Sequence, residues 1–355
     1  MSANPPTWLK LVATRVESRL SEFLQDEQDR WSALDGDLNA PLGELTRLVA
    51  AGGKRLRPAF CYLAFVGVGG DENSKQLLDT QAALELLHAS ALLHDDIIDG
   101  SLTRRGEPTS HTRYIAKHLD SKWAGEARRF GEGAAILIGD LAFVYADQLM
   151  TGVNSMTAKV WNEMRIEVNI GQYLDLLGSA QRERNLNKAE RVCRYKSGKY
   201  TVERPLHLGA TLAAPEQADV LLEQLSNFGL PLGDAFQMRD DVLGAFGDTS
   251  SSLTGKPIGD DLREGKPTPL LAMACERATV AQREVLDQVG ATQISHQEVS
   301  DIQQVIIETG ALDALESKIL MLVEQSIIGV SKSSLDESSK SRLIELAEFV
   351  ASRKN

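Results

Sequence analysis

The chain has 355 residues, 43% of them hydrophobic, a size that suits one large core or two ordinary domains. Its formal net charge of −12 argues against a general binder of nucleic acid or of an anionic membrane. An anionic ligand must therefore be held by a local basic cluster. Because no break in composition marks a linker, we predict a single domain over residues 1–355.

Three cysteines, Cys61, Cys193 and Cys275, lie far apart and form no CxxC pair, which is typical of buried thiols in a reducing cytosol. The first twenty residues lack the apolar core of a signal peptide. No stretch approaches the ~20 apolar residues of a membrane-spanning helix. These features predict a cytoplasmic protein without membrane insertion.

Apolar residues at three- and four-residue spacing run through most of the chain, and the alternation typical of strands is almost absent. Glycine and proline collect between these segments, which predicts short connections at Gly52-Gly53, Gly100–Pro108, Gly178 and Gly255–Gly265. The serine-rich stretch 331–340 is interpreted as a loop near the last helix. The pattern predicts an all-α, antiparallel bundle of about ten or more helices. The clearest helical segments are Leu9–Leu24, Leu78–Ile98, Ala134–Met150, Lys159–Leu177, Val220–Phe246 and Asp313–Ile328.

A basic segment, GGKRLRP at residues 52–58, follows the first helical region. Its two glycines let backbone amides approach a ligand closely. Lys54 and Arg57, three positions apart, are able to hold one phosphate group together. Surface lysines and arginines usually only make a protein soluble. The two glycines beside them are what favours a phosphate-binding role for this segment.

Aspartates stand at the C-terminal end of the segment Leu78–Ile98. Asp95 and Asp99 are four residues apart and share one helix face, with Asp96 beside them. Carboxylates are unfavourable at a helix C-terminus, where the dipole is already negative, and a cation compensates for this. A small number of hard oxygen ligands suits Mg²⁺, which takes its remaining ligands from water and phosphate.

A second acidic pair, Asp240 and Asp241, stands on the apolar segment Val220–Phe246. Either cluster alone could be a solvated helix end. Two such clusters on apolar helices favour a central cavity lined by carboxylates from facing helices, a known way to build metal sites in bundles.

More cations lie close to these clusters in sequence. Arg104-Arg105-Gly106 follows the first cluster after a short loop, and the glycine-rich GKPIGDDLREGK at residues 255–266 follows the second. The lysines considered as further phosphate ligands are Lys196, Lys199, Lys256 and Lys266. Their proximity to the acidic clusters favours a role at the same site.

These motifs together resemble the trans-prenyl diphosphate synthases over about residues 52–266. LLHDDIID at 92–99 with RRG at 104–106 is similar to the first aspartate-rich motif of that family, and FQMRDD at 236–241 to the second. GGKRLRP, Gly139-Asp140, GQYLD at 171–175 and Tyr195-Lys196 fall in the family order. Since site residues themselves match, the resemblance carries function as well as fold.

The resemblance implies an isoprenoid synthase fold and a Mg²⁺-dependent homodimer that joins isopentenyl diphosphate to an allylic diphosphate. It implies that Asp95, Asp99 and Asp240 coordinate Mg²⁺, three ions when substrate is bound. Asp96 and Asp241 would support them.

The resemblance also assigns the substrate contacts. Arg104, Lys196 and Lys256 would act on the leaving diphosphate, with Lys266 as a further substrate-binding cation. Ser197 and Gln237 would face the carbocation. The isopentenyl diphosphate site would comprise Gly53, Lys54, Arg57, His88 and Arg105.

Product length is predicted from the helix that carries Asp95. In the family, an aromatic residue five or four positions before the first aspartate closes the tunnel at fifteen carbons, and here Ser90 and Ala91 are small. Leu87 and Leu84 lie ~12 Å and ~16 Å below Asp95 at 1.5 Å per residue and would form the next floor. Each isoprene unit adds roughly 4–5 Å. We therefore predict geranylgeranyl diphosphate, with farnesyl or longer products of 25 carbons and above as alternatives.

Two departures from the family pattern stand out. Gly244 replaces a third aspartate often found in the second motif. The segment Tyr114–Gly133 is longer than the usual link and resembles an insertion of actinobacterial geranylgeranyl diphosphate synthases.

Three other functions share single features with this sequence. A class I terpene cyclase would need a second motif that residues 240–248 do not supply, and a non-catalytic synthase subunit would typically lose an aspartate motif or the RRG. His94-Asp95 suggests an HD-type phosphohydrolase, but the remaining histidines are poorly placed. His94 is interpreted as a packing residue or as one that supports a metal ligand.

Overall fold

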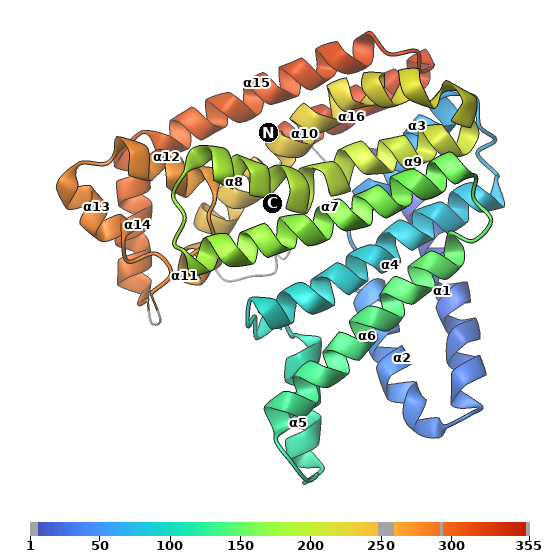
Figure 1. The fold of residues 1–355 in the computed structure, drawn as a ribbon, viewed down its shortest axis with the longest axis horizontal. Helices are drawn as coiled ribbons and strands as arrows, with labels where there is room; N and C mark the ends of the chain where they lie inside the picture. The colour runs from blue at the N-terminus through green and yellow to red at the C-terminus, as the bar shows by residue number, and fades with distance from the viewer. Residues whose placement is uncertain (1–5, 248–258, 292–293, 353–355) are drawn as a thin grey trace.

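The computed structural model describes residues 6–247, 259–291 and 294–352, which form long helices packed side by side (Figure 1). The predicted all-α bundle is confirmed. The N-terminal half contains α1 (Thr7–Ser32), η1 (Gly36–Leu38), α2 (Asn39–Ala50), α3 (Leu56–Gly67), α4 (Lys75–Ile98), the strands β1 (Thr103–Arg104) and β2 (Glu107–Pro108), α5 (Ser110–Asp120), α6 (Ala127–Leu149) and α7 (Ser155–Ala180). The C-terminal half contains α8 (Leu186–Val192), η2 (Cys193–Glu203), α9 (Arg204–Ala213), η3 (Pro215–Gln217), α10 (Ala218–Phe246), α11 (Asp260–Glu264), α12 (Pro269–Arg277), α13 (Val280–Leu286), α14 (His296–Glu308), α15 (Ala311–Ser331) and α16 (Glu337–Ser352).

The long helices share one continuous core. α4 packs along α6 and α3, and α10 packs along α15 on one side and η2 on the other. The largest fully buried side chains include Phe60 of α3 and Phe228 of α10, whose rings meet edge to face at 6.4 Å. Full burial of such a side chain contributes about 1.5–3 kcal/mol. These contacts fix the helices whose ends carry the acidic motifs.

η2 is a π-helix of 11 residues that lies between α7 and α10. Glycines remove the side chains that would separate these backbones. A Cβ atom at Gly171 of α7 would lie 2.2 Å from the backbone N of Lys196, and one at Gly233 of α10 would lie 2.5 Å from the carbonyl O of Gly198. η2 is therefore seated backbone to backbone on both neighbours.

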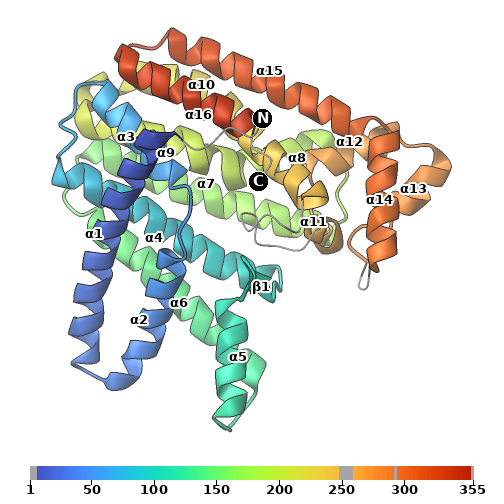
Figure 2. The same ribbon diagram turned by 180° about the vertical axis from the view of Figure 1, so that it is seen from behind.

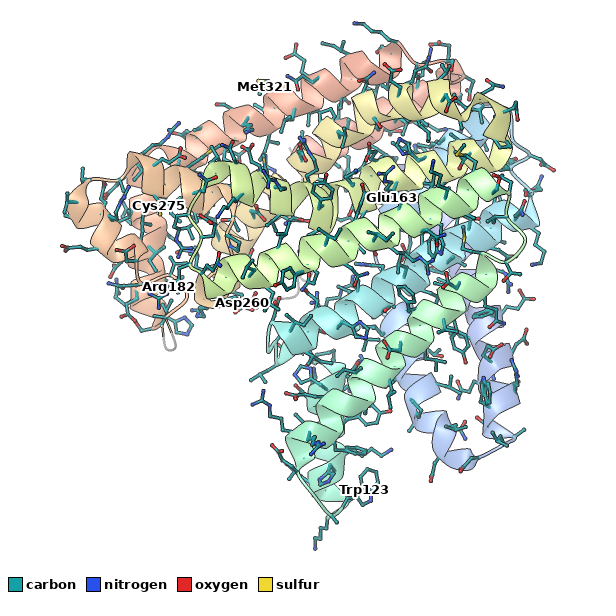
Figure 3. The ribbon with its side chains drawn as sticks, in the orientation of Figure 1. Trp123, Glu163, Arg182, Asp260, Cys275 and Met321 are labelled. Atoms are coloured by element: carbon teal, nitrogen blue, oxygen red, sulfur yellow. The ribbon has the colours of Figure 1, made fainter. Side chains whose placement is uncertain are left out.

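α5 and the N-terminal end of α6 form an arm that projects from the body (Figures 1 and 2). The predicted insertion Tyr114–Gly133 makes up most of this arm. Trp123 lies at its end (Figure 3). It belongs to an aromatic cluster in which the ring centroids of Trp123 and Phe130 are 5.2 Å apart. The insertion thus has a small packed cluster of its own.

Three predicted connections were wrong in detail. The described part of Gly255–Gly265 contains the helix α11. Gly178 lies inside α7 and not in a connection. A glycine fits there because Pro267 packs against it, and a Cβ atom at residue 178 would lie 2.8 Å from Pro267 Cγ. The loop near the last helix covers only residues 332–336, because Asp336 Oδ1 accepts hydrogen bonds from the backbone N–H groups of Ser338 and Ser339 and so starts α16. Gly178 therefore allows a close contact with Pro267, and the serines after residue 336 belong to α16.

None of the helices in the described ranges combines the length and apolar character that a membrane span requires.

Candidate functional site

α4 carries the first acidic motif to its C-terminal end. The Ser74 side chain accepts a hydrogen bond from the backbone N–H of Leu77 and caps the start of α4. The helix ends at Ile98, Asp99 is the C-cap residue, and Gly100 turns the chain with a φ of 66°. The aspartates therefore stand at a helix end, as the sequence predicted.

This end of α4 opens on a cavity of about 830 Å³. Most of the predicted site residues line it: Gly53, Lys54, Arg57, His88, Asp95, Asp96, Arg104, Arg105, Lys196, Ser197, Gln237, Asp240, Asp241 and Lys266. Asp99 is reached from this cavity by Lys266, whose Nζ lies 2.9 Å from Asp99 Oδ2. Lys256 lies outside the described residues. Segments far apart in the sequence thus bring both acidic motifs and the basic segments to one space.

The predicted chain-length residues are not part of the cavity wall. Ser90, Leu87 and Leu84 are buried in the core at 2%, 2% and 0% exposure, and Ala91 is half-buried. They lie on α4 below the acidic motif, at the depths that the helix rise gives. Their role stays a prediction.

Lys196 of η2 joins the first motif to α7. Its Nζ lies 2.5 Å from Asp175 Oδ2 and 3.1 Å from Asp95 Oδ1. Burial favours the neutral amine, but Asp95 and Asp175 outweigh it and raise the pKa of Lys196. Lys196 is therefore a charged ammonium group at the bottom of the acidic site.

Arg104 and Lys266 make similar contacts from two other segments. The hairpin of β1 and β2 places Arg104, whose Nη2 lies 2.6 Å from Asp96 Oδ1 and 3.7 Å from Asp95 Oδ2. Lys266 contacts Asp99 and, at 2.9 Å, Glu264 Oε2. Burial acts against the charge of Lys266, yet Asp261 and Asp99 raise its pKa well above the ordinary value. Each of these cations is held by carboxylates.

The second motif stands on α10 with its two aspartates in different settings. Asp241 is buried, its Oδ1 accepts a hydrogen bond from Gln237 Nε2 at 2.8 Å, and the Cys193 thiol donates to Oδ2 at 3.6 Å. Burial, followed by repulsion from Asp261 and Asp240, raises the pKa of Asp241 to about 8. The buried setting of Asp241 therefore disfavours its charged form.

A carboxylate that the sequence interpretation missed stands beside Gly244. A Cβ atom at Gly244 would lie 2.0 Å from Asp261 Oδ2, so the Asp261 side chain fills the space next to this glycine. Asp261 belongs to α11 and lines the cavity with Asp240. The signal was present in the segment GKPIGDDLREGK, but only the fold shows that Asp261 takes the place of a side chain at position 244.

The basic segment divides into structural and cavity-facing residues. Arg55 adopts a φ of 49° and donates from Nη1 to Glu85 Oε2 at 2.5 Å, with both side chains buried. Arg105 donates to the carbonyl O of Gly52 at 2.5 Å and so joins the RRG motif to this segment. Burial, and then the charges of Arg57 and Arg104, hold the pKa of His88 well below its usual range, so His88 is neutral. Lys54, Arg57 and Arg105 are the basic residues of these two segments that line the cavity together with Arg55 and Arg104 but are not held by the Glu85 or Asp96 carboxylates.

The donor set suits Mg²⁺ better than a metal with an all-protein ligand cage. Among the described residues, no three histidine, cysteine or carboxylate side chains converge on one point. Mg²⁺ is usually bound through one or two carboxylates and completes its shell with water and substrate phosphates. Carboxylates from α4 and α10 on one cavity, next to basic groups for a phosphate, fit that mode.

His94 lies away from this chemistry. Its Nε2 is 3.2 Å from the carbonyl O of Ile136 and 3.5 Å from Asp140 Oδ1, and a Cβ atom at Gly139 would collide with the ring at 2.3 Å. The Gly139-Asp140 motif therefore accommodates His94 against α6. The structure agrees with His94 as a packing residue.

Known proteins share this architecture and sequence. A family model for polyprenyl synthetase matches residues 41–308. The geranylfarnesyl diphosphate synthase of Aeropyrum pernix is 32% identical over 348 residues, which cover 95% of this chain and 99% of that protein. The geranylgeranyl diphosphate synthase of Mycobacterium tuberculosis is 35% identical over 243 residues, or 66% of this chain and 63% of that protein.

A solved structure extends the likeness to the whole fold. The geranylgeranyl pyrophosphate synthase of Corynebacterium glutamicum, complexed with isoprenyl diphosphate and magnesium, superposes with a TM-score of 0.89 and 34% identity. The match covers 98% of this chain and 99% of that one. The chain therefore belongs to the polyprenyl synthetase family and is a trans-prenyl diphosphate synthase, as its motifs predicted.

Proposed function

We propose that this prenyltransferase condenses isopentenyl diphosphate with an allylic diphosphate, with Mg²⁺ as its metal and geranylgeranyl diphosphate as its main product. The observation that carries the proposal is the shared cavity. Carboxylates of α4 and α10 face it together with the basic groups of residues 53–57, 104–105, 196 and 266. Incubation of the purified protein with Mg²⁺ and the two diphosphates, followed by chromatography of the products, tests it directly. A cyclic hydrocarbon or no product would contradict it.

In this scheme Asp95, Asp99 and Asp240 hold the metal, three ions when substrate is bound, and Asp96 and Asp241 support them. Bound Mg²⁺ neutralises charge on the leaving diphosphate. Lys196 and Arg104 now rest on carboxylates of the first motif, and Lys266 rests on Asp99. When a diphosphate enters, these cations exchange carboxylate for phosphate oxygens and stabilise the charge that develops as the allylic C–O bond breaks.

The second substrate would be positioned by a second group of basic residues on the same cavity. Lys54, Arg57 and Arg105 would bind the diphosphate of isopentenyl diphosphate, with neutral His88 beside them and the glycine backbone at residue 53 close by. This places its double bond near the allylic cation, and the proximity supplies much of the rate. The Ser197 and Gln237 oxygens line the same cavity and would face the cation.

Product length rests on the residues below Asp95. Ser90→Phe is expected to shorten the main product from twenty to fifteen carbons, because an aromatic ring would close the path along α4 one turn below the motif. Leu87→Ala is expected to lengthen it. Chromatography of dephosphorylated products measures both. A main product of thirty carbons or more in the wild type, or no shortening in Ser90→Phe, would contradict the assignment, and relatives named for both twenty- and twenty-five-carbon products make this measurement decisive.

We also propose a homodimer through one face of α6 and α7. These helices lie on the same side of the molecule (Figures 1 and 2), and their solvent side carries large apolar residues. The exposed set is Ile136, Leu137 and Val144 on α6 and Ile166, Ile170, Tyr173 and Leu176 on α7. An exposed apolar stripe on two helices is typical of a protein interface.

Light scattering is expected to give twice the chain mass of 38.8 kDa for the wild type. Leu137→Asp with Tyr173→Asp is expected to shift it toward the monomer, since a carboxylate in an apolar interface is strongly unfavourable. Val280→Asp on α13, at a site that is 83% exposed, serves as the control and should keep the wild-type mass. A monomeric wild type would refute the dimer.

Two further features stay proposals. The continuous core supports a single domain over the whole chain. The three cysteines are free and buried, which supports a cytoplasmic location.

A further inference from the structure

The π-helical pitch of η2 places an unusual set of residues on the cavity wall. In a π-helix the hydrogen bonds join residues five apart, so such residues lie nearly above one another. In an α-helix with 3.6 residues per turn they would point about 140° apart. Lys196 and Thr201 are five apart, and both line the cavity, as do Val192 and Ser197. An α-helical η2 would turn Thr201 away from the wall that Lys196 occupies.

Thr201 holds the side chain of Arg57. Arg57 Nη2 donates a hydrogen bond to Thr201 Oγ1 at 3.0 Å, and Thr201 is only 1% exposed. The Arg57 guanidinium carbon also lies 4.3 Å from the ring centroid of Tyr200, the neighbouring residue of η2. The Nε atom of Arg57 is buried and has no hydrogen-bond partner among the described residues. Two contacts from η2 thus fix the guanidinium and leave donors for an incoming anion.

The chemistry of these contacts separates Arg57 from its neighbours. Arg55 is paired with Glu85 and Arg104 with Asp96, so a carboxylate balances each of those charges. Within the described residues, Arg57 has no ion pair. A hydroxyl group orients a guanidinium without neutralising it, whereas a carboxylate does both. Arg57 therefore keeps its full charge for a ligand in a defined orientation.

We propose that Thr201 is a positioning residue for the isopentenyl diphosphate site, acting through Arg57. The π-helix is the device that allows one segment to serve both substrates, since it presents Lys196 to the leaving diphosphate and Thr201 to the guanidinium that receives the second diphosphate. This inference rests on the proposed function and adds to it a residue that the motifs do not contain.

Thr201→Val keeps the shape of the side chain and removes the acceptor. Its KM for isopentenyl diphosphate is expected to rise about tenfold, the scale of one hydrogen bond to a charged group. kcat and the KM for the allylic substrate should stay within about twofold of the wild type. Thr201→Ser, which restores the hydroxyl, should recover the wild-type KM. Thr211→Val serves as the matched control, because Thr211 is a buried threonine of α9 whose hydroxyl bonds to the carbonyl O of His207, and its kinetics should not change.

A double-mutant cycle separates positioning from a general structural role. In an Arg57→Ala background, Thr201→Val should raise the KM no further, because the group it positions is gone. An unchanged KM in Thr201→Val, no recovery in Thr201→Ser, or a full additional effect in the Arg57→Ala background would overturn the inference. These outcomes leave the proposed function standing, whereas failure of the wild type to form any prenyl diphosphate would refute the function itself.

Discussion

Asp95→Ala is expected to lower turnover by at least ~10²-fold, the scale of losing one electrostatic stabiliser of a developing charge. Asp95 has three important neighbours. It shares a helix face with Asp99, and it contacts both Lys196 and Arg104. In the proposed scheme its loss removes a metal ligand, and it also removes one of the two carboxylates that each of these cations contacts. Steady-state turnover with Mg²⁺ and both diphosphates measures the effect.

The same assay with a chelator should abolish activity in the wild type, and Mg²⁺ or Mn²⁺ should restore it. Asp313→Ala provides a matched control, since Asp313 is an exposed aspartate in the first turn of α15. Circular dichroism should show that both variants are folded. Near wild-type turnover in Asp95→Ala, or activity that survives the chelator, would show that Asp95 does not hold an essential metal.

The second large effect concerns the division of labour between the basic groups. Lys196→Ala is expected chiefly to lower kcat, by about 10²-fold, because in the proposed scheme Lys196 faces the charge that appears as the allylic bond breaks. Arg57→Ala is expected chiefly to raise the KM for isopentenyl diphosphate, because in the proposed scheme Arg57 binds that substrate before and during the reaction alike. Varying the concentration of each substrate separately gives kcat and the KM for isopentenyl diphosphate of each variant.

Lys318→Ala is a suitable control for both variants. Lys318 of α15 is paired with Glu190 of α8 and is not part of the cavity wall, so its loss should leave both constants unchanged. If Lys196→Ala raised the KM for isopentenyl diphosphate and Arg57→Ala lowered kcat instead, the two diphosphate sites would be reversed.

Local pattern predicted the elements that carry the site. The positions of the aspartates along α4 and α10 could be predicted because helical periodicity depends only on the residue types within each segment. The gathering of Lys196 with Asp95 and Asp175 could not be obtained in this way, since these residues come from η2, α4 and α7. The family resemblance assigned Lys196 and Asp95 to one site but gave Asp175 no role, and the structure supplied both distances.

Three features could not be predicted from the sequence, each for a physical reason. The π-helical pitch of η2 leaves no mark in a pattern read at 3.6 residues per turn. The position of Asp261 beside Gly244 depends on how α11 folds back onto α10. Arg55 was given no role within GGKRLRP, and only its buried partner Glu85 shows that it stabilises the fold.

The backbone contacts of η2 limit which sequences can support this site. At Gly171 and Gly233 even a methyl group would have to displace the main chain of the helix that holds Lys196, and Gly198 meets the backbone of Gly233 in the same way. A charged residue on the cavity wall can be replaced by another polar group with a loss of rate and an intact fold. The three glycines have no such substitute. The narrowest mutational tolerance of the enzyme should therefore fall on residues that never touch a substrate.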